Sequence, residues 1–303
     1  MNNKHNERKF YISYTANFSN LNDQELLIWL CEPQNSSFQQ INNFSISENP
    51  ISTYDHNANR IHFIKISDRK DFKIIMTFEA DLWQNNLHLD PVVAKPVERD
   101  RSSDFLKNDL FLEQTKDIKY LVGSIIGKEK NYLMQAYLFS NYLKTNFKYT
   151  EIVDKRGVAN QDLNNISGDC GEAGSLFVTM CRVAGIPAKN HTGYVIYYDD
   201  LKNIYEHGWT SIYLNNIGWI QIDPLAKNIQ IENGIFVYEQ NNYLLSFNEE
   251  FNIPLIPPIP DNFNISYWED IGLPINRKSS QVIQPLVFAS KKPINFSQKV
   301  EVK

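Results

Sequence analysis

The stretch from residue 168 to residue 223 limits the fold most tightly, because it reads as a helix followed by a pair of strands. The first part carries apolar side chains at the spacing of one helical face, namely Ala173, Phe177, Met180 and Ala184. Gly168-Asp169 precedes this run, and Gly185 and then Pro187 end it, as expected for the two ends of a helix. We therefore predict a helix with Cys170 at its N-terminus.

The second part predicts an antiparallel hairpin. Trp209–Leu214 and Trp219–Asp223 are rich in β-forming residues, and Asn215–Gly218 between them is a good turn. His207 lies just before the first strand, so the pairing brings His207 and Asp223 to the same end of the hairpin. A turn centred on residue 215 would set them nearly opposite, although the register is not fixed by the sequence and a bulge could enter.

Cys170, His207 and Asp223 carry the three groups of a thiolate acyl-transfer site. A thiolate attacks a carbonyl, an imidazole moves the proton and a carboxylate orients the imidazole. A helix N-terminus favours the thiolate and presents free N–H groups to a developing oxyanion, so the Cys170 N–H is a candidate donor. The alternatives are a buried structural cysteine, a structural histidine, and an aspartate that only forms a turn before Pro224.

The other two cysteines read as packing residues. Cys181 is eleven positions after Cys170 and falls mid-helix on the buried face, and Cys31 lies beside an apolar strand. Three cysteines without a CxxC pair predict neither a disulfide framework nor a structural zinc site. We expect no metal, no calcium dependence and no cofactor.

This central region, roughly residues 130–226, resembles the bacterial transglutaminase-like superfamily, which shares its core with papain-type cysteine proteases. The matching residues are Gly168, Cys170, Arg182, Gly185, Ile186, Pro187, Ala188, His207, Trp209, Gly218, Trp219, Asp223 and Pro224. The chain departs from the pattern at Gly208, where many members carry Ala, but a small residue is kept. The resemblance implies a papain-like core of helices packed on an antiparallel sheet, with Cys170, His207 and Asp223 as its catalytic residues.

The N-terminal part predicts strands rather than helices. Phe10–Ala16, Leu26–Leu30, Arg60–Ile66 and Phe72–Phe78 are short runs of β-formers separated by turn residues, which suggests a β-sandwich. Many transglutaminase-like proteins carry such a domain before the core, so the fold class predicted is α+β.

Three segments follow from these patterns. Residues 1–100 form the sandwich domain, ending in a polar, proline-containing stretch. Residues 101–250 form the catalytic core and include a helix-periodic region at 105–147. Residues 251–303 form a proline-containing extension packing on the core, in which Ile253–Pro260 is extended.

Further residues could line the cleft or bind substrate. Tyr149 matches an aromatic position often seen ahead of the family's cysteine. Gln161, Asn164 and Asn165 are the candidates for a side-chain oxyanion donor, with no order among them. Trp209 is a substrate-site candidate that would pack around the site and keep it dry, although tryptophans also fill cores for ordinary reasons.

Composition excludes several partners. The net charge is −5, no basic tract is present to suggest nucleic acid or a membrane surface, and no apolar run is long enough to cross a membrane. The first residues lack an apolar signal-peptide segment, so we expect a cytoplasmic protein. The oligomeric state is not predicted.

The function expected is acyl transfer through a Cys170 thioester on a peptide, amide or acyl-thioester substrate. Water as acceptor makes the protein a cysteine peptidase or amidase, which we favour because water is always present. An amine acceptor makes it a transglutaminase or amide synthase. A binding or scaffold module that keeps the fold without catalysis is the third alternative.

Overall fold

The computed structural model describes residues 5–21, 24–89, 103–150, 156–197, 201, 204–215, 217–232, 235–250, 252–265, 276–280, 286–292 and 294–303. The chain divides into two compact units, each assembled from three separate segments. Unit 1 comprises residues 1–5, 84–191 and 207–241, and unit 2 comprises residues 6–83, 192–206 and 242–303.

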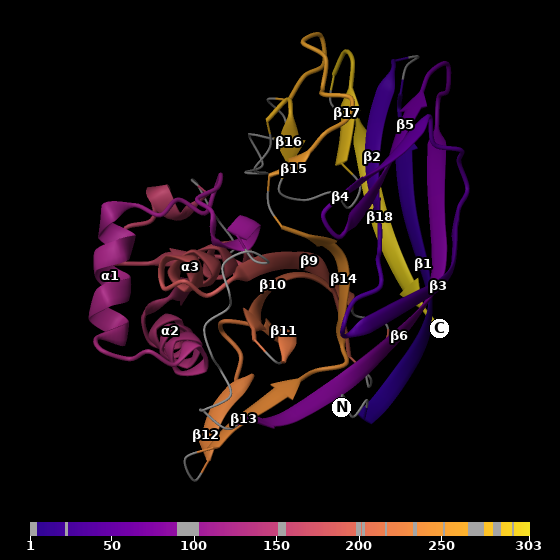
Figure 1. Cartoon of the computed structure of the whole chain (residues 1–303). Coiled ribbons are helices and arrows are strands. Elements are labelled where there is room, and N and C mark those ends of the chain that lie inside the picture. The colour runs from indigo at the N-terminus through magenta and orange to yellow at the C-terminus, as the bar shows by residue number, and fades with distance from the viewer. Residues whose placement is uncertain are drawn as a thin grey trace. The chain divides into compact units, whose positions relative to one another are not determined.

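Unit 2 is built almost wholly from strands. Its elements are β1 (His5–Ser19), β2 (Leu26–Glu32), β3 (Gln39–Ile46), β4 (Ser52–His56), β5 (Asn59–Ile66), β6 (Phe72–Leu89, whose last residues belong to unit 1), β14 (Leu244–Glu249), β15 (Ile253–Pro254), β16 (Ser279–Ser280), β17 (Leu286–Ala289) and β18 (Asn295–Val302). One sheet has the order β17-β2-β5-β4, and a second contains β3, β6, β1 and β18. These are the antiparallel sheets that the strand patterns predict, and their strands β1 to β5 are labelled in Figure 1.

Period-two burial explains why these segments are strands. Alternate residues of β1 enter one core, and Ile12, Tyr14 and Ala16 are fully buried there. In β2, Ile28 joins the same core, while its neighbour Trp29 enters a second core with residues from β17. A strand that buries both faces reads as a continuous apolar run rather than as an alternating one.

The C-terminal strands return to the N-terminal ones. β18 pairs with β1, β17 pairs with β2, and β15 of the proline-containing segment pairs with β16. The contiguous domains with ends at residues 100 and 250 stay a prediction. The compact units are a separate description, in which each unit joins three segments of the chain. The polar stretch that holds the first boundary, residues 90–102, lies outside the described residues.

Unit 1 contains the helices and the second half of the α+β fold. Its elements are η3 (Ser103–Leu106), α1 (Lys116–Ile126), α2 (Tyr132–Asn146), β7 (Lys148–Tyr149), η4 (Val158–Asn160), β8 (Ser167–Gly168), α3 (Cys170–Val183), β9 (Ala188–Ile196), β10 (Ile204–Leu214), β11 (Gly218–Ile222), β12 (Ile229–Glu232) and β13 (Ile235–Gln240). Strands β9 and β10 each continue into unit 2. The helix-periodic region at 105–147 is thus two helices, α1 and α2.

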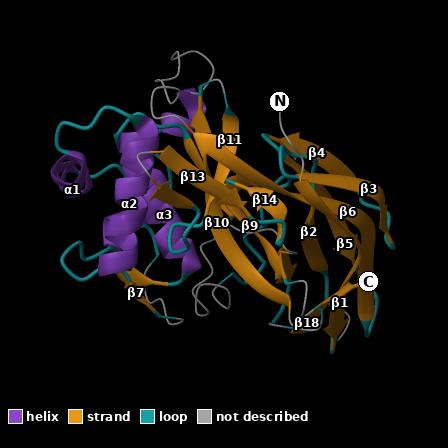
Figure 2. Ribbon diagram, turned by 90° about the horizontal axis from the view of Figure 1, so that it is seen from below, coloured by secondary structure: helices purple, strands orange, loops and turns teal. Residues whose placement is uncertain are grey.

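The helices pack on the sheet that contains β9, β10 and β11, and α3 is the helix next to it (Figures 1 and 2). Gly174 permits this close approach, because a Cβ there would lie only 2.9 Å from Oδ1 of Asn190 in β9. In a different sheet, the last residues of β6 pair with β13, from Asn85 with Gln240 to Leu89 with Phe236. The α+β fold class is confirmed.

Within the described part of the chain, no helix combines the length and the apolar character needed to cross a membrane.

Candidate active site

Helix α3 begins at Cys170, as the sequence predicts. Asp169 caps the helix: its Oδ1 accepts hydrogen bonds from the N–H groups of Gly171 at 2.8 Å and Glu172 at 3.3 Å. Among the described residues, the N–H of Cys170 has no hydrogen-bond partner, because the cap oxygen bonds to the next two groups instead. Cys170 therefore presents both its thiol and a free N–H at the positive end of the helix.

The residues before the helix bring Tyr149 to the same place. The two-residue strands β7 and β8 pair in parallel, with Tyr149 opposite Gly168. Gly168 has φ +152, and a Cβ there would lie 2.5 Å from the Cβ of Glu172, so the chain can pass the first turn of α3 only with glycine at this position. Tyr149 therefore lies opposite the residue that is two positions before Cys170 in the chain.

The hairpin supplies His207 and Asp223, with a register that differs from the simplest expectation. β10 and β11 pair from Thr210 with Ile222 to Leu214 with Gly218, so the turn is centred one residue later than 215. Asp223 then falls level with Trp209, and His207 lies two residues further along the same face. The imidazole spans this offset, and its Nε2 lies 2.8 Å from Oδ2 of Asp223.

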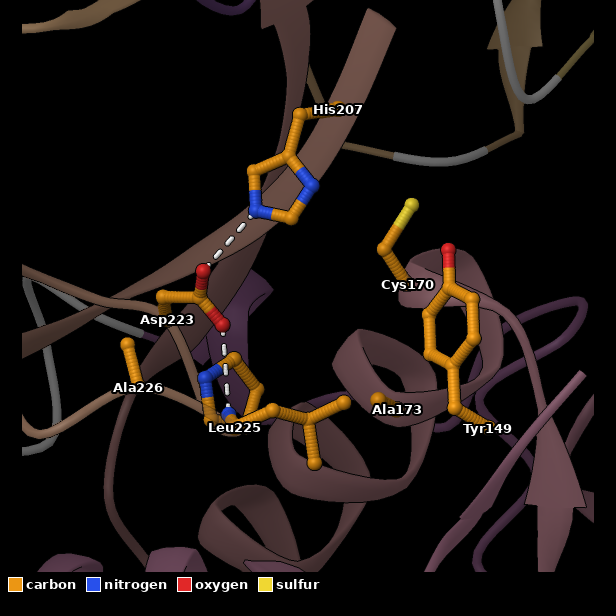
Figure 3. A pocket seen from close by; sticks show the side chains of 8 residues that line it. Tyr149, Cys170, Ala173, His207, Asp223, Leu225 and Ala226 are labelled. Atoms are coloured by element: carbon orange, nitrogen blue, oxygen red, sulfur yellow. Dashed lines mark hydrogen bonds and ion pairs between the residues drawn. The ribbon is translucent and has the colours of Figure 1, made fainter. Parts of the chain in front are cut away.

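Cys170, His207 and Asp223 line one pocket of about 240 Å³ together with Tyr149, Ala173 and the turn 224–226. Figure 3 shows the imidazole between the other two groups, with Nε2 toward Asp223 and Nδ1 on the side of Cys170. The same turn holds the carboxylate, because the N–H of Leu225 donates to Oδ1 of Asp223 at 3.1 Å. The side chains of His207 and Asp223 keep 23% and 21% of their surface exposed, so water reaches the site.

The electrostatics of the pocket favour a charged imidazole. Burial by itself lowers the pKa of His207, but the hydrogen bonds to Asp223 and Cys170 and the charges of both groups outweigh it and raise the pKa from 6.5 to about 10. His207 is therefore held as imidazolium between two acidic groups, which is the arrangement that supports a thiolate nucleophile.

The other two cysteines differ from Cys170 in their burial. Cys31 and Cys181 are fully buried, whereas Cys170 is only partly buried. Burial raises the pKa of the Cys31 and Cys181 thiols above the ordinary value. Their assignment to packing fits these positions.

Trp209 packs against the imidazole of His207. Its indole is fully buried and stacks on His207, with 6.1 Å between ring centroids and 20° between planes. The indole also stacks on His191, with 5.6 Å between ring centroids and 9° between planes, and His191 Nε2 lies 2.7 Å from Ser211 Oγ. Burial lowers the pKa of His191 well below 6.5, so this second imidazole is neutral. Trp209 thus lies outside the pocket lining, and its predicted place in the substrate site stays a prediction.

An ion-pair cluster that the sequence reasoning missed braces the start of α3. Arg156 bonds Oδ2 of Asp169 at 2.9 Å and Oε2 of Glu172 at 2.6 Å. The Glu172 side chain is 1% exposed, and burial with the neighbouring Asp169 raises its pKa to about 8 against the opposing effect of Arg156. Asp169 and Glu172 in a first helical turn are a visible signal, but Arg156, thirteen residues upstream in a loop, has none.

The three amide candidates for an oxyanion donor lie away from the pocket lining. Gln161 Oε1 accepts a hydrogen bond from Ser167 N at 3.4 Å. Asn164 and Asn165 are exposed and bond through their N–H groups to Asp162. The described lining contains none of them, whereas it does contain Tyr149, so their role as donors stays a prediction.

The described residues contain no group of three or more His, Cys, Asp or Glu side chains that could hold a metal ion.

Comparison with known proteins agrees with this geometry. Residues 119–224 match the family described as the transglutaminase-like superfamily, a range that contains Cys170, His207 and Asp223. The chain therefore carries a transglutaminase-like superfamily core, with antiparallel β-sheets contributed by the N-terminal segment.

Individual relatives are distant. An uncharacterized protein of Haemophilus influenzae is 22% identical over 310 residues, covering 82% of each chain. The solved structure of a "putative cysteine protease" from Cytophaga hutchinsonii superposes with a TM-score of 0.61 at 15% identity, covering 99% of this chain and 93% of that one. The periplasmic domain of TgpA from Pseudomonas aeruginosa gives a TM-score of 0.41 at 15% identity, covering 66% of this chain and 69% of that one. The Cytophaga match extends the shared fold over nearly the whole chain.

Proposed function

We propose that this protein is a thiol-dependent hydrolase that cleaves an amide, peptide or thioester bond through a Cys170 acyl-enzyme. The observation that carries the proposal is the placing of His207 between Asp223 and Cys170 in one pocket, with the thiol at a helix N-terminus. The description of the Cytophaga hutchinsonii protein points in the same direction.

Each step assigns a role to one of these groups. The Cys170 sulfur attacks the carbonyl carbon, forming an S–C bond, while the carbonyl electron pair moves to oxygen near the free Cys170 N–H. Collapse of this intermediate breaks the bond to the leaving amine or thiol, which takes a proton from His207. Water then gives a proton to His207 and attacks the thioester, releasing the carboxylic acid and restoring the Cys170 thiolate beside the protonated imidazole. Asp223 holds the imidazole in position throughout.

Hydrolysis is favoured over transfer to an amine by the exposure of the site. His207 and Asp223 each keep about a fifth of their side-chain surface in contact with solvent. Water therefore reaches the imidazole that would activate it. An amide-forming reaction uses the same acyl-enzyme and differs only in the acceptor, so the product decides between them.

The test is intact mass spectrometry of the full chain with peptide amides and acyl thioesters as donors, with and without a primary amine. We expect an acyl adduct on the wild-type protein, its absence in Cys170→Ala, and free acid as product even with abundant amine. Amide product would reassign the protein as an acyltransferase. No adduct with any donor, together with Cys170 no more reactive to iodoacetamide than Cys31 and Cys181, would identify a non-catalytic module.

The buried cysteines supply matched controls. Cys31→Ser leaves Cys170 and its partners in place and should form the same adduct as the wild type. Peptide mapping of the labelled protein then assigns the adduct to Cys170 alone.

A further inference from the structure

Apolar side chains line one side of the pocket beside Cys170. Ala173 comes from the first turn of α3, and Pro224, Leu225 and Ala226 come from the turn that follows β11. In Figure 3 the side chain of Leu225 extends toward Ala173, closing the side of the pocket away from the imidazole. The volume, about 240 Å³, lies below the roughly 300–1,000 Å³ of pockets for drug-sized ligands, so it suits one side chain rather than a large molecule.

We infer that this pocket selects an uncharged aliphatic acyl group, and that Leu225 and Ala226 set the length it accepts. The inference rests on the proposed function, because it concerns the acyl group that Cys170 would carry. Apolar walls gain free energy by covering aliphatic carbon, whereas a charged acyl chain would lose its water there without a partner. The two alanines leave the space, and a larger side chain at either would fill it.

The charged groups around the pocket define the rival expectation. Lys144 lies close enough to Lys227 and to Asp223 for both of their charges to act on it, and the two lysines could attract an acidic acyl chain. Neither lysine belongs to the described lining, however, and the two charged groups that do line the pocket, the imidazolium of His207 and the carboxylate of Asp223, are paired with one another. Arg156 is engaged by the carboxylates of Asp169 and Glu172. The pocket interior therefore favours the neutral chain.

The experiment compares N-acetylcysteamine thioesters of acetic, butanoic, hexanoic, succinic and 3-aminopropanoic acids on the full chain. Acylation of Cys170 is followed by intact mass spectrometry. We expect the butanoyl donor to react at least tenfold faster than the succinyl donor, which has the same chain length but ends in a carboxylate, and faster than the 3-aminopropanoyl donor. The acetyl donor is too small to depend on the pocket and reports the proposed chemistry alone.

Two variants test the named wall. Ala226→Leu should lower the hexanoyl-to-acetyl rate ratio at least fivefold, and Leu225→Ala should raise it. Ala159→Leu, the same change at an exposed alanine outside the lining, should leave the ratio unaltered. Because each result is a ratio within one protein, a general loss of active enzyme does not imitate it.

The outcomes separate the two proposals. Acylation by the acetyl donor with equal rates for butanoyl and succinyl, or with a succinyl preference, overturns the aliphatic pocket and leaves the proposed function standing. An unchanged ratio in both wall variants overturns the roles of Leu225 and Ala226. Failure of every donor to acylate Cys170 removes the proposed function and the inference with it.

Discussion

The imidazole of His207 should remain protonated far above neutral pH, and Asp223→Asn should lower its pKa. The pKa rises from 6.5 to about 10 because the hydrogen bonds and charges of Asp223 and Cys170 outweigh the effect of burial. At about 1.36 kcal/mol for each tenfold change in proton affinity, that rise corresponds to at most roughly 5 kcal/mol of favourable interaction with the imidazolium. Screening by water at a side chain with 23% exposure reduces this to a few kcal/mol.

The assay is an NMR titration of protein carrying ¹³C-labelled histidine, in which His207→Gln assigns the resonance among the six histidines. We expect a wild-type midpoint near 10 and, in Asp223→Asn, a midpoint lower by at least one pH unit. Asparagine keeps an oxygen that can accept from the N–H of Leu225, so the turn is retained while the charge is lost. Asp55→Asn, the same change at a carboxylate that pairs with Arg60, should leave the midpoint in place.

Stability follows with a definite sign. A group whose pKa is higher in the folded chain stabilises the fold fully below its unfolded pKa of about 6.5, and loses that contribution as the pH rises through about 10. Urea unfolding should therefore show Asp223→Asn to be less stable than the wild type by a few kcal/mol at pH 6, with the difference shrinking toward pH 10. A wild-type midpoint near 6.5, or one that Asp223→Asn does not move, would refute the reasoning.

Three further predictions concern packing and the start of α3, each measured by urea unfolding. Gly193→Ala should destabilise the chain by several kcal/mol, because the new Cβ would lie 1.9 Å from a backbone carbonyl oxygen of β14. Gly208→Ala should be tolerated, because the atom nearest to its Cβ would be 3.7 Å away. Equal losses of stability in the two variants would contradict this reasoning. Asp169→Ala should lower the free energy of unfolding by about 1–2 kcal/mol or more, because it removes the helix cap and a partner of Arg156. Asp169→Asn should lower it by less, because asparagine can still cap the helix. A larger loss in Asp169→Asn than in Asp169→Ala would show that the cap is unimportant. A carboxyl whose pKa is raised to about 8 in the folded chain costs stability as the pH rises from about 5 to about 8. Glu172→Gln removes this carboxyl and should therefore make the decline in stability over that range smaller. A decline unchanged from the wild type would show that other groups cause it.

Much of the fold was accessible from the sequence because local patterns fixed it. Gly168-Asp169 and the apolar face that follows predicted a helix beginning at Cys170, and α3 begins there. The alternation in β1 and the turn before Trp219 predicted an antiparallel strand arrangement, and the hairpin pairs as expected. In these places propensity, periodicity and turn chemistry agree with the tertiary packing.

The parts that could not be predicted depend on contacts between distant residues. The offset of His207 from Asp223 follows from a turn centred one residue later than expected, which shifts the pairing by two residues and which the turn sequence does not determine. Arg156 bonds to the first turn of α3 from a loop with no periodic pattern. Gln161 and Asn164 lie upstream of Cys170 in a stretch without a periodic pattern that would fix the direction of their side chains, and neither belongs to the described pocket lining, so their role as oxyanion donors stays a prediction.

The ladder between β6 and β13 has a practical consequence for anyone who would express part of this protein. A fragment that starts at residue 101 discards the β6 residues that hydrogen-bond to Phe236–Gln240, although those residues belong to the same compact unit as Cys170. Such a fragment would expose a new strand edge, and unpaired edges recruit other copies of the chain into aggregates. A fragment that starts at residue 84 would retain this strand.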